Sequence, residues 1–174
     1  NLRNLNHKIF RESGLLNNGG KALHRGIEVS GAIYPVEGLK LYGSGAIQRA
    51  TIEYGMNKGN RVPYAPRYTA TAGAKYQCGV GEGTLTTNVY GNFVSSQFSD
   101  LANTFEGSAN GNVGLIPKFF LLNATASYSY KQWNFNLNAL NLLNRKYFTT
   151  RHNAWGGIMP AATISVLGGV GYQF

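Results

Sequence analysis

The chain has 174 residues and a net charge of +9, but only 13% of its residues are charged, about half of the usual fraction. No stretch approaches the roughly 18 to 20 apolar residues of a membrane-spanning helix, and the mean hydropathy is −0.20, which excludes a helical membrane protein. The 16 lysines and arginines are scattered without a basic run, so the charge indicates an anionic lipid or solute rather than nucleic acid.

Seven segments alternate apolar and polar side chains with a period of two, which places neighbouring side chains on opposite faces of a β-strand. The polar face carries mostly Asn, Thr, Ser and Gly rather than charged residues. Strands of about 9 to 11 residues suit a tilted crossing of a lipid hydrocarbon layer. The stretch at residues 5–10 is a further candidate strand end. In chain order, the seven segments are residues 27–34, 39–48, 67–77, 84–93, 122–130, 133–140 and 161–174.

Short and long connections alternate between these segments. The short turns are residues 35–38, 79–83 and 131–132, and the long loops are residues 11–23, 52–65, 95–117 and 142–160. In an up-and-down transmembrane barrel, short turns face the periplasm and long loops face outward. We therefore predict an all-β fold, an antiparallel transmembrane β-barrel or an arc of one, with about seven or eight strands.

Aromatic residues are expected at the short-turn end, where Tyr and Trp rings favour the boundary between lipid and water. The last segment, residues 161–174, has one nearly apolar face that finishes in two aromatic rings, and a small or polar face interrupted by Leu167. Such a strand suits the closure of an outer-membrane barrel. The aromatic residues expected at this end are Tyr34, Tyr76, Tyr130, Trp133, Tyr172 and Phe174.

Four blocks in sequence order resemble the TonB-dependent outer-membrane receptors. Residues 25–39 contain Arg-Gly-Ile-Glu-Val, then a proline and Gly-Leu, and residues 59–66 read Gly-Asn-Arg-Val-Pro-Tyr-Ala-Pro. Residues 140–147 read Leu-Asn-Leu-Leu-Asn-Arg-Lys-Tyr, and Pro160 precedes a strand that ends in Tyr-Gln-Phe. Leu143 stands where the family has an aromatic residue, and Ala161 stands where it has an arginine.

This resemblance implies a place in a larger protein. Members of the family have about 22 strands around a plugged lumen, so residues 1–174 are expected to be the C-terminal part of such a barrel, without the plug domain. Gly169, Tyr172 and Phe174 match the family's assembly signal, which implies recognition by the barrel-assembly machinery in the bacterial outer membrane.

The resemblance also implies a function. The receptor would take up a ferric siderophore, with energy from the inner-membrane TonB system through a segment outside this chain. The substrate would be a ferric chelate, and no resident cofactor is expected. The positive charge slightly favours an anionic chelate, and the other expected partners are outer-membrane lipid and lipopolysaccharide.

Arginine forks and aromatic rings on long outer loops would suit an anionic chelate. The alternative is that the loop cations are solvated or contact lipopolysaccharide and that the loop tryptophan packs its own loop. By the alternation, Arg67 faces the lumen, where it could pair with an acid of the plug or the wall. The candidate ligand residues are Tyr54, Arg61, Arg67, Arg151, His152 and Trp155.

Two other functions stay open. A small eight-stranded structural or adhesin barrel would fit the alternation equally well. An outer-membrane hydrolase would need a serine or acid beside a histidine, but no partner of His152 stands out, so an enzyme is not expected. The three histidines are far apart and Cys78 is the single cysteine, so the sequence predicts no protein metal site.

Overall fold

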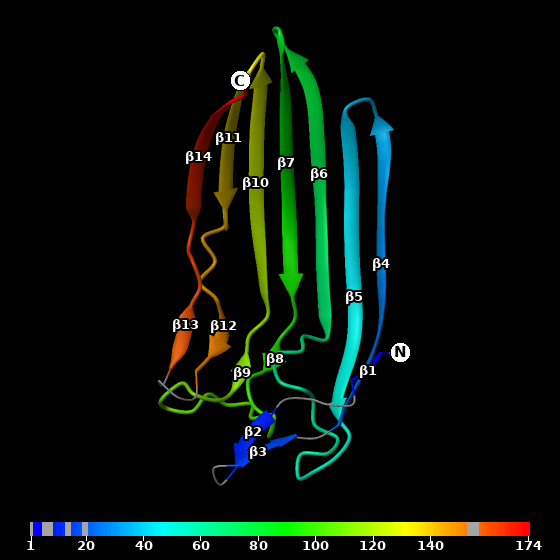
Figure 1. Cartoon of the computed structure of the whole chain (residues 1–174), viewed down its shortest axis with the longest axis vertical. Coiled ribbons are helices and arrows are strands. Elements are labelled where there is room, and N and C mark those ends of the chain that lie inside the picture. The colour runs from blue at the N-terminus through cyan, green and yellow to red at the C-terminus, as the bar shows by residue number, and fades with distance from the viewer. Residues whose placement is uncertain (1, 5–8, 13–14, 19–20, 153–156) are drawn as a thin grey trace.

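The computed structural model describes residues 2–4, 9–12, 15–18, 21–152 and 157–174. Strands dominate this part of the chain, and no described helix is long and apolar enough to cross a membrane. Eight strands form the main sheet (Figure 1). In sheet order they are β1 (Leu2–Asn4), β4 (Ala22–Val36), β5 (Leu39–Ile52), β6 (Tyr68–Val80), β7 (Gly83–Val94), β10 (Phe119–Tyr130), β11 (Trp133–Leu140) and β14 (Ser165–Tyr172).

Every neighbouring pair in this sheet is antiparallel. Three small two-stranded sheets lie in the long connections (Figure 1). They pair β2 (Ile9–Glu12) with β3 (Leu15–Asn18), β8 (Gln97–Phe98) with β9 (Leu115–Ile116), and β12 (Phe148–Arg151) with β13 (Ile158–Pro160).

All seven predicted segments are strands of the main sheet, so the predicted antiparallel all-β fold is confirmed. Most boundary differences lie at the loop end, where β4 and β5 extend beyond the alternating pattern and β14 begins only at Ser165. The candidate strand end at residues 5–10 is tested only at residues 9 and 10, which lie in a strand. Residues 5–8 lie outside the described part, residue 9 begins β2 in a small sheet, and the eighth strand is β1.

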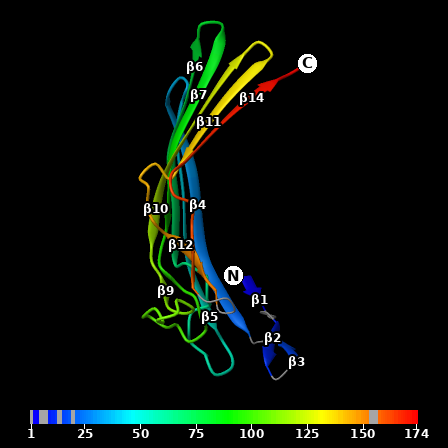
Figure 2. The same cartoon turned by 90° about the vertical axis from the view of Figure 1, so that its left-hand side faces the viewer.

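The register confirms the two predicted faces, because directly paired residues point to the same side of a sheet. Ile27 pairs with Ile47, which pairs in turn with Tyr68 on the apolar face. On the polar face, Ser129 pairs with Asn134, which pairs with Gly171. Among the described residues, no second layer covers the apolar face (Figure 2), and its side chains are largely exposed.

The sheet bends into an open arc (Figure 2). Strands β1 and β14 are its two edges, so the described residues form part of a barrel wall and not a closed barrel. This corrects the alternative of a small closed eight-stranded barrel. Ile27 is 73% exposed and Val170 is 66% exposed, and such a continuous apolar face is stable against an apolar medium or partner rather than against water.

The predicted separation of short turns from long loops is confirmed. The turns after β4, β6 and β10 lie at one end of the sheet, and the long connections gather at the other end (Figure 1). The cluster of buried apolar residues lies at the loop end, and Ala65 and Leu101 pack against it. Its buried members are Ala22, Ala50, Ile52 and Val62.

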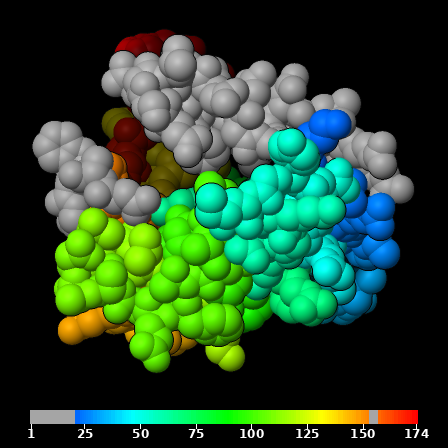
Figure 3. Space-filling view, turned by 90° about the horizontal axis from the view of Figure 1, so that it is seen from below, coloured from blue at the N-terminus to red at the C-terminus, as the bar shows by residue number. Residues whose placement is uncertain are grey.

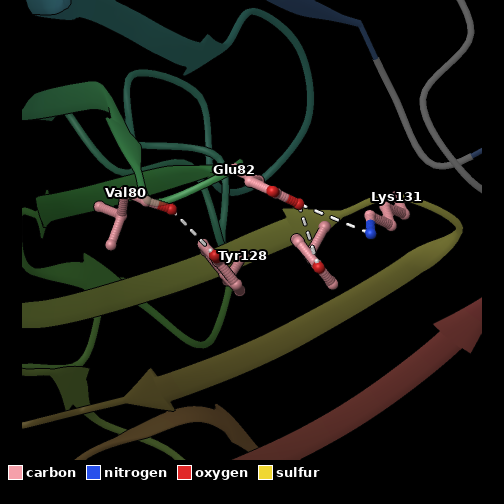
Figure 4. A network of polar contacts seen from close by, with 5 residues as sticks. Val80, Glu82, Tyr128 and Lys131 are labelled. Carbon is pink, nitrogen blue, oxygen red and sulfur yellow. Dashed lines mark hydrogen bonds and ion pairs between the residues drawn. The ribbon is translucent and has the colours of Figure 1, made fainter.

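Two neighbouring turns are joined by polar contacts at the short-turn end (Figure 4). Glu82 lies 3.5 Å from the Lys131 ammonium group and accepts a hydrogen bond from the Tyr130 hydroxyl over 3.2 Å. The Tyr128 hydroxyl donates to the Val80 carbonyl oxygen over 2.9 Å. These contacts therefore link the turns after β6 and β10 to each other at the short-turn end of the wall.

Aromatic rings cluster at this end, as predicted. The Trp133 and Tyr172 ring centroids are 4.9 Å apart, and those of Tyr172 and Phe174 are 5.1 Å apart. Tyr34 also lies at this end, as predicted, but on the polar face. Its ring lies 5.8 Å from the Lys40 ammonium group, and Lys40 is on the polar face opposite Lys75.

Candidate functional site

The long loops after β5 and β7 pack side by side at one end of the sheet (Figure 3). The Asn103 side chain forms two hydrogen bonds with the Arg61 main chain. The Arg61 N–H donates to Asn103 Oδ1 over 2.7 Å, and Asn103 Nδ2 donates to the Arg61 carbonyl over 2.8 Å. The Tyr64 N–H donates to the Phe98 carbonyl over 2.8 Å. These hydrogen bonds join the two loops, and the Tyr64 hydroxyl also contacts β12. We call residues 60–64, 97–104 and 148–152 the loop platform.

The Arg61 side chain lies half-buried in the loop platform. Its guanidinium carbon is 5.4 Å from the centroid of the Phe98 ring, and Nη2 donates to the Ala65 carbonyl over 3.4 Å. Burial, and secondarily the charge of Arg67, lowers the pKa of Arg61 below its ordinary value. A guanidinium group nevertheless stays protonated at neutral pH. Arg61 is thus a partly desolvated cation beside a second cation, which favours a nearby anion.

Arg151 was predicted as a ligand residue, and its guanidinium group is already engaged by protein groups. The residue is 9% exposed. Nη1 donates to the Gly111 carbonyl over 3.0 Å, and Nη2 donates to the Leu115 carbonyl over 3.2 Å. The Arg151 carbonyl in turn accepts the Tyr64 hydroxyl over 2.8 Å. Arg151 therefore connects β12 to both loops of the platform.

The other predicted ligand residues lie in different surroundings. Tyr54 is 73% exposed in the turn after β5. The main-chain N–H of His152 donates to the Gly157 carbonyl over 3.0 Å, and its Nδ1 atom is buried without a hydrogen-bond partner among the described residues. Trp155 lies outside the described residues. The structure brings Arg61 and Arg67 together, and it links Arg151 to the same platform through Tyr64.

Arg67 stays a candidate for the predicted lumen-facing position. It lies one residue before β6, and its guanidinium carbon is 5.3 Å from the centroid of the Tyr68 ring. Tyr68 belongs to the apolar face, because it pairs with Ile47. The alternation assigned Arg67 to the polar face, and the Gln48 N–H donates to the Arg67 carbonyl over 2.9 Å, so the backbone pairing with β5 continues through Arg67 while its long side chain lies beside the neighbouring ring.

A ladder of side-chain amides crosses the polar face below the loop platform. Asn92 donates to the Thr71 hydroxyl over 2.9 Å, and Asn123 donates to Asn92 over 3.1 Å. Asn123 also accepts the main-chain N–H of Asn141 over 3.0 Å. The ladder joins three strands to the segment after β11, and sequence reasoning missed it because the contacts depend on register.

Asn141 and Asn144 give a structural reason for the block at residues 140–147. Both have positive φ, 52° and 47°, a left-handed conformation that asparagine tolerates better than most residues. Asn141 is 3% exposed; its side chain donates to the Arg145 carbonyl over 2.9 Å and accepts the Arg145 N–H over 2.8 Å. This block therefore forms a tight turn anchored to the inner face.

A second group of charges lies on the polar face near the short turns. Lys40 and Lys75 are directly opposed on neighbouring strands, and they line an open hollow of about 880 Å³ together with Tyr34, Gln77 and Thr84. The Tyr42 hydroxyl donates to Asn88 Oδ1 over 3.0 Å beside them. In the described part of the chain, no three His, Cys, Asp or Glu side chains gather in a way that could hold a metal ion.

Comparisons with known proteins agree with this architecture. Residues 5–142 match the family model described as TonB dependent receptor-like, beta-barrel. The chain is similar to the solved structure of the unliganded ferric citrate transporter FecA, with 30% identity, coverage of 89% of this chain and 25% of that chain, and a TM-score of 0.75.

Two further solved structures share the fold. The ferric preacinetobactin receptor BauA from Acinetobacter baumannii has 25% identity, coverage of 91% of this chain and 23% of that chain, and a TM-score of 0.73. The ferric yersiniabactin uptake receptor FyuA from Yersinia pestis has 20% identity, coverage of 90% and 24%, and a TM-score of 0.73, which supports the fold alone. The chain spans about a quarter of the length of these proteins.

Proposed function

The chain belongs to the family of TonB-dependent receptor-like β-barrels, and from this premise we propose that it forms part of an outer-membrane receptor for a ferric siderophore. The family is of the receptor and transporter type. The observation that carries the proposal is the 30% identity to the ferric citrate transporter FecA over 89% of this chain. The loop platform supports it, because it presents cations at the end of the wall that carries the long loops.

The described wall is the C-terminal part of a barrel of about 22 strands in this proposal. Two edges, β4 beyond its short pairing with β1 and the free side of β14, would pair with further strands of the same barrel, because unpaired backbone groups in lipid are costly. Gly169, Tyr172 and Phe174 would be read by the barrel-assembly machinery. The Phe174 side chain is exposed at the short-turn end, which supports such a contact.

The preferred substrate would be an anionic ferric chelate. Support comes from the net charge of +9 and from the partly desolvated Arg61 cation beside Arg67. Citrate is a carboxylate ligand, and arginine forks match carboxylates well. Arg61 and the exposed Tyr54 would contact the chelate, while Arg151 would hold the platform in shape.

Energy for uptake would come from the TonB system through a segment outside this chain. Glu28, Lys40 and Lys75 lie on the polar face and would contact water or the plug domain. Lys40 and Lys75 support this role because they are opposed and make no ion pair among the described residues, which leaves them available to acids on an inner domain.

The proposal is tested on the full-length receptor in detergent. Equilibrium binding is measured for ferric citrate, a ferric catecholate and a neutral ferric trihydroxamate. We expect one ferric chelate to bind, with an anionic one preferred, and Arg61→Gln to weaken that binding by about ten- to a hundredfold, as for a charge-assisted hydrogen bond. Lys131→Gln, at the opposite end of the wall, is the matched charge control.

Each result has a defined meaning. If none of the three ferric chelates binds, the receptor proposal fails. If the neutral trihydroxamate binds best, the preference for an anionic chelate fails while the receptor proposal stands. Equal affinities of the Arg61→Gln and Lys131→Gln variants would remove Arg61 from the site.

A further inference from the structure

Two arginines lie side by side on the outer face, directly beyond the apolar rows at the loop end. Arg25 of β4 pairs with Arg49 of β5, and the next pair on the same face is Ile27 with Ile47. Side chains two residues apart on a strand share a face. The arginine pair is therefore the first polar row above the apolar surface.

This pairing is unfavourable without an anion. Directly opposed Cβ atoms lie about 4.5 to 5.5 Å apart, and like charges at this spacing destabilise a sheet. Both arginines are exposed, and neither forms an ion pair with a described residue. The arrangement is explained if an anionic group outside the described chain lies between the two guanidinium groups.

Neighbouring groups make the region strongly cationic. A hollow of about 390 Å³ is lined by Arg49, Thr51, Lys58, Gly59 and Glu53. Glu53 is the acid in this group, and its main-chain N–H donates to the Lys21 carbonyl over 2.7 Å. Glu53 makes no ion pair with any described residue. Cations therefore outnumber this single carboxylate.

β6, the strand next to β5, is directly preceded by a further arginine. Tyr68 pairs with Ile47 on the apolar face, and the Arg67 guanidinium carbon lies 5.3 Å from the Tyr68 ring centroid. A tyrosine with a cation beside it is typical of a membrane boundary, where the ring meets acyl chains and the charge meets headgroups. Arg67 directly precedes β6 and lies opposite Gln48, the neighbour of Arg49 in β5.

We propose that Arg25 and Arg49 bind a phosphate group on the headgroup of an outer-leaflet lipid. Arginine forks bind phosphate in a bidentate manner, and the site is continuous with an apolar face that would hold the acyl chains. This continuity favours a lipid over free phosphate. The inference rests on the membrane placement of the apolar face, and it is independent of which iron chelate the loops bind.

The test uses the full-length receptor reconstituted in phosphatidylcholine nanodiscs that contain a trace of lipid A. Retention of lipid A is measured by native mass spectrometry for the wild type and for the Arg25→Gln/Arg49→Gln variant. We expect the variant to retain about tenfold less lipid A, consistent with loss of charge-assisted hydrogen bonds. The Lys40→Gln/Lys75→Gln variant removes the same charge from the polar face and should retain lipid A like the wild type.

Two further arms identify the ligand. Dephosphorylated lipid A should be retained by the wild type as poorly as lipid A is retained by the arginine variant. Inorganic phosphate at millimolar concentration should not displace lipid A. Displacement by inorganic phosphate would overturn the lipid assignment in favour of a free-anion site.

Other outcomes also count against the proposal. Equal retention of lipid A by the wild type and the arginine variant, or equal losses in the arginine and lysine variants, would overturn it. If the arginine variant does not fold, the wild-type comparison between phosphorylated and dephosphorylated lipid A decides the question. Equal retention of phosphorylated and dephosphorylated lipid A by the wild type would then contradict the proposal.

Discussion

At the scale of single residues, Arg61 and Arg151 illustrate how the same side chain can have two roles. Both were selected from the sequence as arginines on long outer loops. Arg61 is half-buried, and its side-chain hydrogen bond to the Ala65 carbonyl is long, 3.4 Å. Arg151 is buried and donates to two carbonyl groups of the loop after β7. The contacts, rather than the residue type, separate a candidate ligand residue from a residue that holds loops together.

Arg151→Gln is expected to loosen the loop platform. Removal of the guanidinium group leaves the Gly111 and Leu115 carbonyls without their donors, which costs about 2 kcal/mol or more because these hydrogen bonds involve a charged donor. Hydrogen exchange of the full-length receptor should rise in residues 108–116 and stay unchanged at the short turns. Arg151→Lys keeps the charge but cannot reach both carbonyls, so it should resemble Arg151→Gln; wild-type protection in both variants would contradict the assignment.

At the scale of strands, aromatic rings cover glycines on neighbouring strands. A Cβ atom added to Gly91 would lie 2.5 Å from the Phe120 ring, and one added to Gly73 would lie 2.6 Å from the Tyr42 ring. Glycine thus leaves room for a ring across the strand pair, a device that stabilises glycine in sheets. The two examples lie on opposite faces, so both surfaces of the wall use the same packing.

Gly91→Val is expected to displace the Phe120 ring and to lower the free energy of unfolding by about 1 to 3 kcal/mol, the usual cost of overpacking. The measurement is denaturant unfolding of the full-length receptor in lipid vesicles. Phe120→Ala added to Gly91→Val should recover part of the loss, because the two residues are coupled. Gly31→Ala is the control, since nothing lies within 4 Å of its added Cβ. A loss in Gly31→Ala as large as in Gly91→Val would refute the steric explanation.

At the scale of the whole molecule, the wall is a single curved layer with two different surfaces. Its apolar surface has no covering layer among the described residues, and the buried cluster lies only at the loop end. A single layer cannot form a hydrophobic core of its own. In the proposed receptor, the wall would be stabilised by its surroundings, namely lipid on one face and further strands of the barrel at the two edges.

Substitutions on the two opposite faces of β7 test this assignment directly. Val89 lies on the apolar face and Thr86 lies on the polar face, paired with Gln77 and Ser127. Val89→Arg is expected to lower the free energy of unfolding in vesicles by about 2 to 4 kcal/mol, the cost of arginine near the bilayer centre. Thr86→Arg adds the same group to the lumen side and should have little effect. Equal losses would mean that the apolar face does not meet lipid.

The sequence predicted the strands well because side-chain direction in a strand is a local property. The pattern around Val89 or Leu137 assigned each side chain to a face without knowledge of its neighbours, and the register confirmed the assignment. The alternation does not give the contacts of long side chains at strand ends, such as the Arg67 guanidinium group beside the Tyr68 ring. Trp155 lies outside the described residues, so its proposed role stays a prediction.

By itself, the sequence determined the strand pattern, the two faces, the placement of loops and turns, and the family, because these depend on local periodicity and on short blocks of residues. The tertiary structure decided which distant residues meet. Four examples join different strands or loops: the hydrogen bonds between Arg61 and Asn103, the two carbonyl contacts of Arg151, the amide ladder, and the opposed Arg25–Arg49 pair. Such contacts depend on register and on how the loops fold back over the wall, which are global properties that no local pattern encodes.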